Sequence, residues 1–119
     1  MGEIKVSGIK LYAYHGCMPE EKIIGGWYEV DVEIEADINA AIISDKLSDT
    51  VDYALVNEIV RREMNIRSKL VEHVAGRIAI ALLKEIPLIE EVKVKVSKVN
   101  PPVSGEVERF SVEVKEKRK

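Results

Sequence analysis

Glu72 is a charged residue in a segment that is otherwise mostly apolar. It lies in KLVEHVAGRIAIALL, the stretch from Lys69 to Leu83, which is apolar on nearly every side when drawn as a helix at about 100° per residue. Ser68 would cap such a helix, and an acid in the first turn would suit the positive end of the helix dipole. Taken alone, this structural role is the more frequent one for such a residue, and ligand binding is the alternative.

Lys98 is the second residue that departs from its surroundings. It follows Val92, Val94 and Val96 in the same phase of an alternating strand, so its side chain should leave the strand on the helix-covered face. Alternatively, the strand has already ended and the lysine extends its ammonium group to solvent. If Glu72 and Lys98 lie on one side of the same sheet, they form a cleft with an acid and a base.

Two further segments carry polar side chains that could take part in catalysis. HGCMPEE supplies Glu20 and Glu21, which by default belong to a solvated acidic turn. DTVDY supplies Asp49, Asp52 and Tyr53 at a helix start, where aspartate is commonly a cap. Neither segment indicates a binding role by itself.

The sequence predicts no metal or phosphate site. His15 and Cys17 alternate on a loop, His73 is far away in the chain, and no third ligand has the spacing of a zinc site. Gly25 and Gly26 are followed by strand-like residues, whereas a phosphate-binding loop leads into a helix. We therefore expect neither a metal ion nor a cofactor.

The hydrophobic pattern predicts four strands and two main helices around these residues. In the first strand the alternation changes phase at Ser7 and Gly8, which predicts a β-bulge. In chain order, the predicted elements are a strand from Ile4 to Tyr14, a loop to Gly26, a strand from Tyr28 to Ile38, a helical turn from Asn39 to Ile43, helices from Tyr53 to Met64 and from Lys69 to Leu83, and strands around Val92–Val96 and Phe110–Val114.

This order is typical of an α+β fold, a four-stranded antiparallel sheet with two helices on one face, in a single domain over residues 1–119. The other face of the sheet would be charged, with acids on the second strand and lysines on the third. Such a face can meet water, or line a channel if copies of the sheet join into a ring. One short chain offers little to cover the apolar helix from Lys69 to Leu83, so we expect a partner subunit.

The composition limits the class of protein. The net charge is -3, from 18 basic and 21 acidic residues, and aromatic residues make up 5%, which disfavours nucleic-acid binding. The single Cys17 excludes an intrachain disulfide framework, and the sequence shows neither a membrane-spanning stretch nor a signal-peptide core. We therefore expect a cytoplasmic protein without a nucleic-acid or membrane partner.

Five blocks of the sequence together resemble the dihydroneopterin aldolase family of folate biosynthesis: YHGCMPEE, GGWYEVDVEI, SDKLSDTVDY, KLVEHVAGRIA and VSKVNPP. They follow the family's order, and the resemblance runs from Ile4 to Val114. It implies the tunnelling fold, in which four subunits join their sheets into a barrel and two rings commonly stack into an octamer. It also implies pterin sites between subunits, in agreement with a helix that one chain cannot cover.

The resemblance implies roles for eight residues. Glu72 is expected to bind the amino and ring N–H edge of the pterin, because a carboxylate offers two acceptors to two parallel donors. Lys98 is expected to act as general base on the substrate's side-chain hydroxyls through a bound water, with Glu21 orienting that water or the hydroxyls. Tyr53 of the neighbouring subunit would relay the proton that quenches the enol intermediate. Backbone contacts to the pterin are expected from Cys17 and Val71, and from Val51 and Asp52 of the neighbour.

The reaction implied is a retro-aldol cleavage of dihydroneopterin to hydroxymethyl-dihydropterin and glycolaldehyde, with epimerisation of the side chain as a further activity. The substrate's ring imine can accept the electrons, so neither a lysine Schiff base nor a metal is implied. A dihydroneopterin triphosphate epimerase is the alternative enzyme, although the active-site blocks offer only Lys98 and Lys22 as cations for the phosphates. A non-catalytic pterin-binding ring protein is the alternative from another class, and it would need Glu72 more than Glu21, Tyr53 and Lys98.

Overall fold

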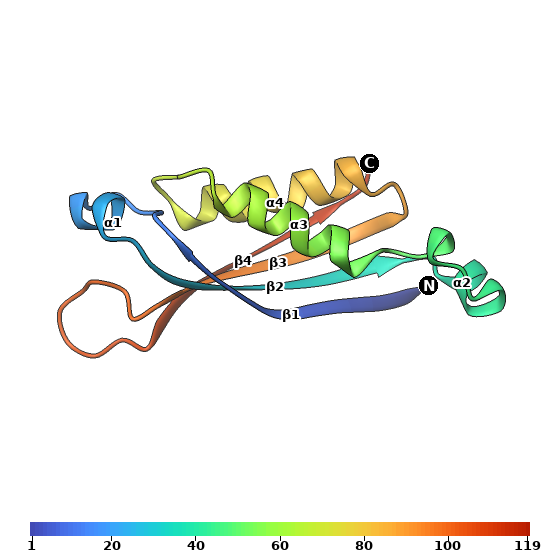
Figure 1. The fold of residues 1–119 in the computed structure, drawn as a ribbon, viewed down its shortest axis with the longest axis horizontal. Helices are drawn as coiled ribbons and strands as arrows, with labels where there is room; N and C mark the ends of the chain where they lie inside the picture. Colours follow the sequence, from blue (N-terminus) through green and yellow to red (C-terminus); the bar gives the residue numbers. More distant parts are fainter.

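Residues 1–119 are all described by the computed structural model, which has a four-stranded antiparallel sheet with helices on one face (Figure 1). The strand order β1-β2-β3-β4 follows the chain. The predicted α+β fold class is therefore confirmed. The elements are β1 (Gly2–Ala13), α1 (Pro19–Ile23), β2 (Gly26–Ala36), α2 (Asn39–Ser44), the 3-10 turn η1 (Leu47–Asp49), α3 (Tyr53–Met64), α4 (Val71–Glu85), β3 (Ile89–Val99) and β4 (Arg109–Lys117).

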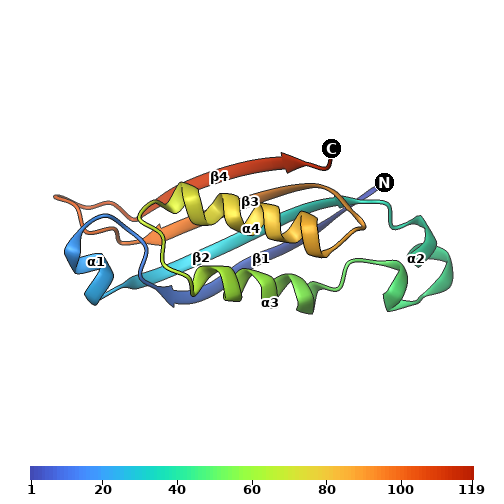
Figure 2. The ribbon, with the colours of Figure 1, turned by 90° about the horizontal axis from the view of Figure 1, so that it is seen from above.

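The core lies between the sheet and the two long helices. In Figure 2, α3 and α4 run side by side across one face of the sheet. Strand alternation turns every second side chain toward these helices, and each fully buried aliphatic side chain contributes roughly 1.5–3 kcal/mol through removal from water. The buried residues of this layer include Val30, Val32 and Ile34 on β2, Val92, Val94 and Val96 on β3, Val56, Ile59 and Val60 on α3, and Val74, Ile78 and Leu82 on α4.

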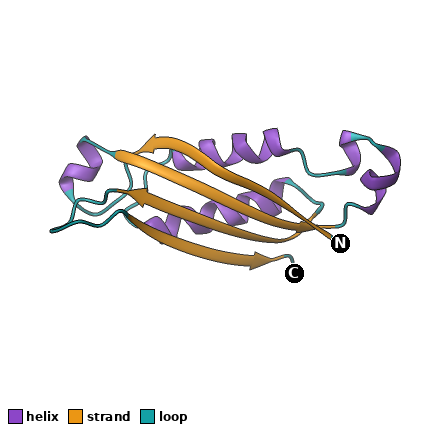
Figure 3. Cartoon of the chain, turned by 90° about the horizontal axis from the view of Figure 1, so that it is seen from below, coloured by secondary structure: helices purple, strands orange, loops and turns teal.

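The opposite face of the sheet is charged and carries no helix (Figure 3). Glu33 on β2 lies 3.3 Å from the ammonium of Lys5 and 3.5 Å from that of Lys93, and Lys93 also lies 3.7 Å from Glu113. The hydrogen bond from Lys5, followed by the charge of Lys93, lowers the pKa of Glu33. The predicted charged face, with acids on the second strand and lysines on the third, is confirmed. The ion pairs between neighbouring strands favour the observed register.

The predicted β-bulge lies where the alternation changes phase. The pairing of β1 with β2 shifts between Val6 and Ile9, and Gly8 has a φ of 70°, a conformation that costs glycine little. The Gly8 N–H donates to the Asp31 carboxylate over 2.8 Å. The bulge therefore allows Ile9 and Leu11 to face the core in the second half of the strand.

Two local predictions are wrong. The segment predicted as a loop up to Gly26 contains the short helix α1, which begins at Pro19 and has the N–H of Met18 donating to Glu21 over 3.3 Å. Ser68 does not cap α4, because Leu70 occupies the capping position without a side-chain hydrogen bond and the Ser68 hydroxyl contacts Arg77 instead. No helix in the structure is both long and apolar enough to cross a membrane.

Candidate active site

An ion pair between Lys98 and Glu21 forms the centre of the candidate site. β3 continues to Val99, so the alternative that the strand ends before Lys98 is wrong. Lys98 lies opposite Tyr28 in the sheet, and its ammonium lies 5.8 Å from the centroid of that ring. The ammonium donates to a carboxylate oxygen of Glu21, and each of the two side chains is only 11% exposed. The alternation phase therefore predicted the direction of the lysine correctly.

Glu21 reaches Lys98 because α1 and the loop before it hold the carboxylate over the end of the sheet. Its second oxygen accepts from the N–H of Met18 at the start of α1. Gly16 has a φ of 139°, and a Cβ atom at this position would collide with the Glu21 carboxyl group. The absence of a side chain at Gly16 is thus a condition for the ion pair.

Two cavities lie against this ion pair. The first has a volume of about 140 Å³ and carries the charges of Glu20, Glu21 and Lys98 in its wall, next to His15, Tyr28 and Asn100. The second has a volume of about 280 Å³ and shares Glu21 and Lys98 with the first. Its remaining wall is largely apolar and comes from Met18, Pro101, Pro102, Val103, Val107 and Phe110. An acid and a base are therefore accessible from a partly enclosed space, as general acid-base chemistry requires.

Tyr28 and His15 line the first cavity as neutral groups. Burial, followed by the charge of Glu21, raises the pKa of Tyr28, and its hydroxyl donates to the His15 carbonyl over 2.8 Å. Burial lowers the pKa of His15 to about 4, and its Nδ1 accepts from the N–H of Ser68 over 2.9 Å. At neutral pH both rings are uncharged, so Glu20, Glu21 and Lys98 supply the charge of this cavity.

The residues predicted to bind the pterin ring lie near the start of α4. Val71 is the first residue of this helix and is buried, whereas the next residue, Glu72, is exposed. Cys17 is exposed, and its thiol donates to the carbonyl of Lys69 over 3.3 Å. Neither cavity is lined by Glu72. We expected Glu72 and Lys98 to form the cleft with an acid and a base. In the structure, the carboxylate that contacts Lys98 belongs to Glu21.

Tyr53 and its two preceding residues lie toward the opposite end of the subunit. α3 begins on the side of α2, whereas α1 lies at the other end of a molecule 52 Å long (Figure 1). Tyr53 is 71% exposed, and Val51 is buried. The Asp52 carboxylate accepts from the N–H of Ala54 over 2.9 Å, which confirms the predicted cap. A single subunit therefore does not bring Tyr53 to Lys98.

Sequence reasoning missed several residues that shape the site. Gly16, Tyr28, Ser68 and Arg77 were not predicted to contribute, and His15 was considered only as a poor metal ligand. Only Tyr28 could have been predicted from the sequence, because it begins the alternation of β2 in the phase that faces the core. His15 and Gly16 both contact Ser68, which lies more than fifty positions further along the chain, and local patterns cannot predict such contacts. The structure has no group of three or more His, Cys, Asp or Glu side chains placed to hold a metal ion.

Comparisons with known proteins agree on one family. The family model for dihydroneopterin aldolase matches residues 4–115. The dihydroneopterin aldolase of Streptococcus pyogenes serotype M18 is 38% identical over 119 residues, which cover 99% of this chain and 100% of that protein. The crystal structure of E. coli dihydroneopterin aldolase in complex with neopterin superposes with a TM-score of 0.89 at 25% identity, over 98% of this chain and 99% of the other. Urate oxidase from Bacillus subtilis 168 shares the fold alone, with a TM-score of 0.70 at 11% identity over 98% of this chain and 46% of the oxidase.

Proposed function

The chain belongs to the dihydroneopterin aldolase family, and on that premise we propose that it cleaves dihydroneopterin to hydroxymethyl-dihydropterin and glycolaldehyde. The observation that carries the proposal is the contact between Lys98 and Glu21 in the shared wall of two cavities. The neopterin complex of the E. coli relative supports a pterin as the ligand class.

Lys98 acts as the general base of the cleavage. In its neutral form the amine accepts the proton of the hydroxyl on the second side-chain carbon, directly or through a water, and the bond between the first and second side-chain carbons breaks to release glycolaldehyde. The ammonium that forms has the carboxylate of Glu21 as its partner, which stabilises the new charge. The bonding electrons pass into the ring imine of the substrate. The enol intermediate that results takes up a proton at the first side-chain carbon, relayed by Tyr53 of the neighbouring subunit, and becomes hydroxymethyl-dihydropterin. The ring thus supplies the electron sink, so the reaction proceeds without a metal ion or a Schiff base.

Glu72 anchors the pterin. Two carboxylate oxygens match the paired donors of the amino group and the ring N–H, and the exposed position of Glu72 leaves the carboxylate open to a ligand. The backbones of Cys17 and Val71 complete the contacts to the ring. Binding and chemistry are therefore assigned to different elements. α4 and the loops before it bind the pterin ring, whereas β3 and α1 supply the residues that act on the side chain of the substrate.

A neighbouring subunit supplies Tyr53 together with the backbones of Val51 and Asp52. Tyr53 is exposed and begins α3 on the side of α2, whereas Glu21, the partner of Lys98, lies on α1 at the other end of the subunit, and this arrangement supports a site shared between copies (Figure 1). β1 and β4 each pair on one edge only, so sheets of neighbouring copies can join edge to edge into a barrel. Ile80 on α4 is 59% exposed, in keeping with a helix that another subunit covers. We assign residues 1–119 to one domain. Four copies of this domain form a ring, and two rings stack into an octamer.

The experiment that tests this function is incubation of the purified protein with dihydroneopterin in the presence of a chelator, with detection of glycolaldehyde. We expect stoichiometric release of glycolaldehyde and hydroxymethyl-dihydropterin. Dihydroneopterin triphosphate is tested as the second substrate. The first cavity has two carboxylates beside one ammonium, and this charge disfavours binding of the phosphates. Pterin binding without product would contradict the proposal and favour a binding protein. Epimerisation of the triphosphate alone would favour the alternative enzyme.

A further inference from the structure

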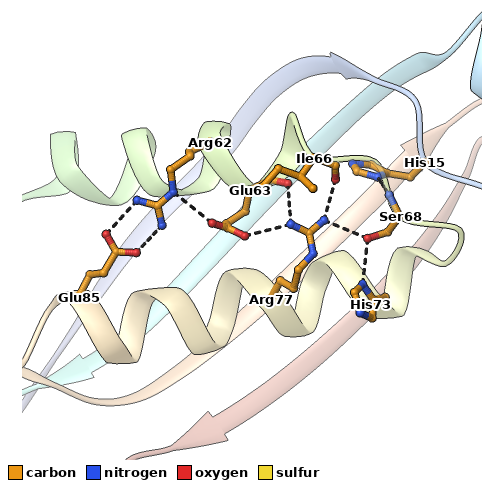
Figure 4. Close-up of polar contacts among 8 residues, drawn as sticks. All are labelled: His15, Arg62, Glu63, Ile66, Ser68, His73, Arg77 and Glu85. Carbon is orange, nitrogen blue, oxygen red and sulfur yellow. Dashed lines mark hydrogen bonds and ion pairs between the residues drawn. The ribbon is translucent and has the colours of Figure 1, made fainter.

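Ser68 joins two loops that precede the proposed pterin-binding residues (Figure 4). It is 6% exposed and lies between α3 and α4, three residues before Val71. Its N–H donates to His15 Nδ1 over 2.9 Å, and its carbonyl accepts from the N–H of Gly16 over 3.0 Å. The backbone of Ser68 thus carries two bonds to the loop that leads from β1 to Cys17.

Two more contacts join the same loops. A guanidinium nitrogen of Arg67 donates to the Gly16 carbonyl over 2.7 Å, and the thiol of Cys17 donates to the Lys69 carbonyl over 3.3 Å. These contacts connect segments about fifty residues apart in the chain. The residues from His15 to Cys17 and from Arg67 to Lys69 therefore form one hydrogen-bonded unit.

Arg77 fixes this unit to the helices. From the second turn of α4, one guanidinium nitrogen donates to the carbonyl and the carboxylate of Glu63 over 3.2 and 3.0 Å. The other donates to the Ile66 carbonyl over 2.7 Å and to the Ser68 hydroxyl over 2.9 Å. A guanidinium group presents several donors in a rigid plane, so one side chain can hold the whole turn between α3 and α4.

The Ser68 hydroxyl also connects Arg77 to the first turn of α4. Because it accepts from Arg77, its hydrogen is free to be donated to His73 Nδ1, which lies 2.9 Å away. His73 directly follows Glu72. Every polar group of Ser68 is thus used, and its partners flank both backbone segments proposed to bind the ring.

We propose that Ser68 and Arg77 are positioning residues that hold the backbones of Cys17 and Val71, and the carboxylate of Glu72, in the geometry that binds the pterin ring. This inference rests on the proposed function. Lys98 and Glu21 make no hydrogen bond to the residues of this network and bond to each other and to Met18 instead, so the loss of Ser68 or Arg77 weakens binding of the ring more than it slows the chemical step.

The test measures KM and kcat for dihydroneopterin, and the Kd for neopterin, in Ser68→Ala and Arg77→Gln. We expect KM and Kd to rise roughly 10-fold or more, since small displacements of positioning groups have effects of this order, while kcat changes by less than about 3-fold. Ser68→Thr keeps the hydroxyl and should restore most of the affinity. Ser68→Ala removes a single oxygen atom, so it provides the test even if Arg77→Gln fails to fold.

Arg62→Gln is the matched control. Arg62 also links α3 to α4, through Glu85, and it contacts its neighbour Glu63 at 3.1 Å, but none of its own hydrogen bonds reaches the loops. We expect Arg62→Gln to lower the thermal stability while leaving KM unchanged. If Ser68→Ala and Arg77→Gln also leave KM and Kd unchanged in an active protein, the network is merely structural and the inference is wrong. If the parent protein neither binds nor cleaves the pterin, the proposed function itself fails.

Discussion

The ammonium of Lys98 and the carboxylate of Glu21 lie in contact within a wall that excludes most of the solvent, and their surroundings decide what the pair can do. Tyr28 and His15 beside them are neutral at neutral pH, so the charge of the ammonium is balanced by the nearby carboxylates of Glu20 and Glu21. In its neutral form the Lys98 amine can take a proton from a bound hydroxyl, and the ammonium that forms has Glu21 as its partner.

Replacing Lys98 with Ala should separate chemistry from binding. We expect Lys98→Ala to bind the pterin product nearly as well as the parent and to lose turnover by on the order of 10²-fold or more, the usual effect of removing an acid-base group. Lys95→Ala, on the opposite face of β3, is the control and should keep its turnover. Borohydride added during turnover should trap no covalent adduct. An adduct on Lys98 would contradict the general-base role, and unchanged turnover would remove Lys98 from the mechanism.

Replacing Glu72 with Ala should abolish pterin binding and leave the assembly intact. The paired donors of the bound ring would lose both acceptors, and leaving such donors buried and unpaired costs roughly 2 to 5 kcal/mol. Titration with neopterin measures the loss, and sedimentation checks the oligomer. Glu58→Ala, which removes another exposed helix carboxylate, serves as the control. Normal neopterin binding by Glu72→Ala would show that the acid only complements the helix dipole.

At the scale of elements, alternation and helical periodicity predicted the sheet, both long helices and the face of the sheet on which the Lys98 side chain lies. Each of these features depends on neighbours within a few residues. α1 was missed, since five residues are too few to show a period. The contact between Glu21 and Lys98 joins residues 77 positions apart, and only the folded chain brings them together. Ser68 was mistaken for the cap of α4, because its hydroxyl contacts the side chains of Arg77 and His73 instead of a backbone N–H in the first turn.

His15 gives the junction between the loops a predictable pH dependence. The pKa of its buried ring is about 4, whereas the unfolded chain titrates near 6.5, so between these values the unfolded state binds more protons. The free energy of unfolding should therefore fall as the pH is lowered from 6.5 toward 5, by up to about 1.4 kcal/mol per pH unit for this one proton. Denaturant unfolding at several pH values measures the slope.

His15→Asn is the informative comparison, because the amide oxygen can still accept from Ser68 while the side chain no longer titrates. Its stability will be lower at neutral pH through lost packing, but the slope between pH 6.5 and 5 should become shallower than that of the parent. Equal slopes in both proteins would show that another group governs this pH range. The carboxylates with lowered pKa values, Glu33 and Glu85, act only at lower pH.

At the scale of the whole molecule, the subunit is elongated, and residues of the proposed site lie toward opposite ends of it. Lys98 and Glu21 meet at the end that carries α1, whereas Tyr53 is exposed on the side of α2 (Figure 1). No motion within one sheet brings these ends together. In the ring that we propose, Tyr53 of each copy meets Lys98 of the next, so every site is completed at once. A head-to-tail contact of this kind forms a ring when its rotation closes.

Mixing two inactive variants tests this account most directly. Tyr53→Phe and Lys98→Ala chains, each nearly inactive alone, are refolded together in equal amounts, and glycolaldehyde release from dihydroneopterin is measured. Random assembly gives about a quarter of the sites an intact Tyr53 from one chain and an intact Lys98 from the next, so activity should return to roughly that fraction of the parent. Mixtures no more active than the separate variants, or a fully active monomer of the parent protein, would contradict the shared site.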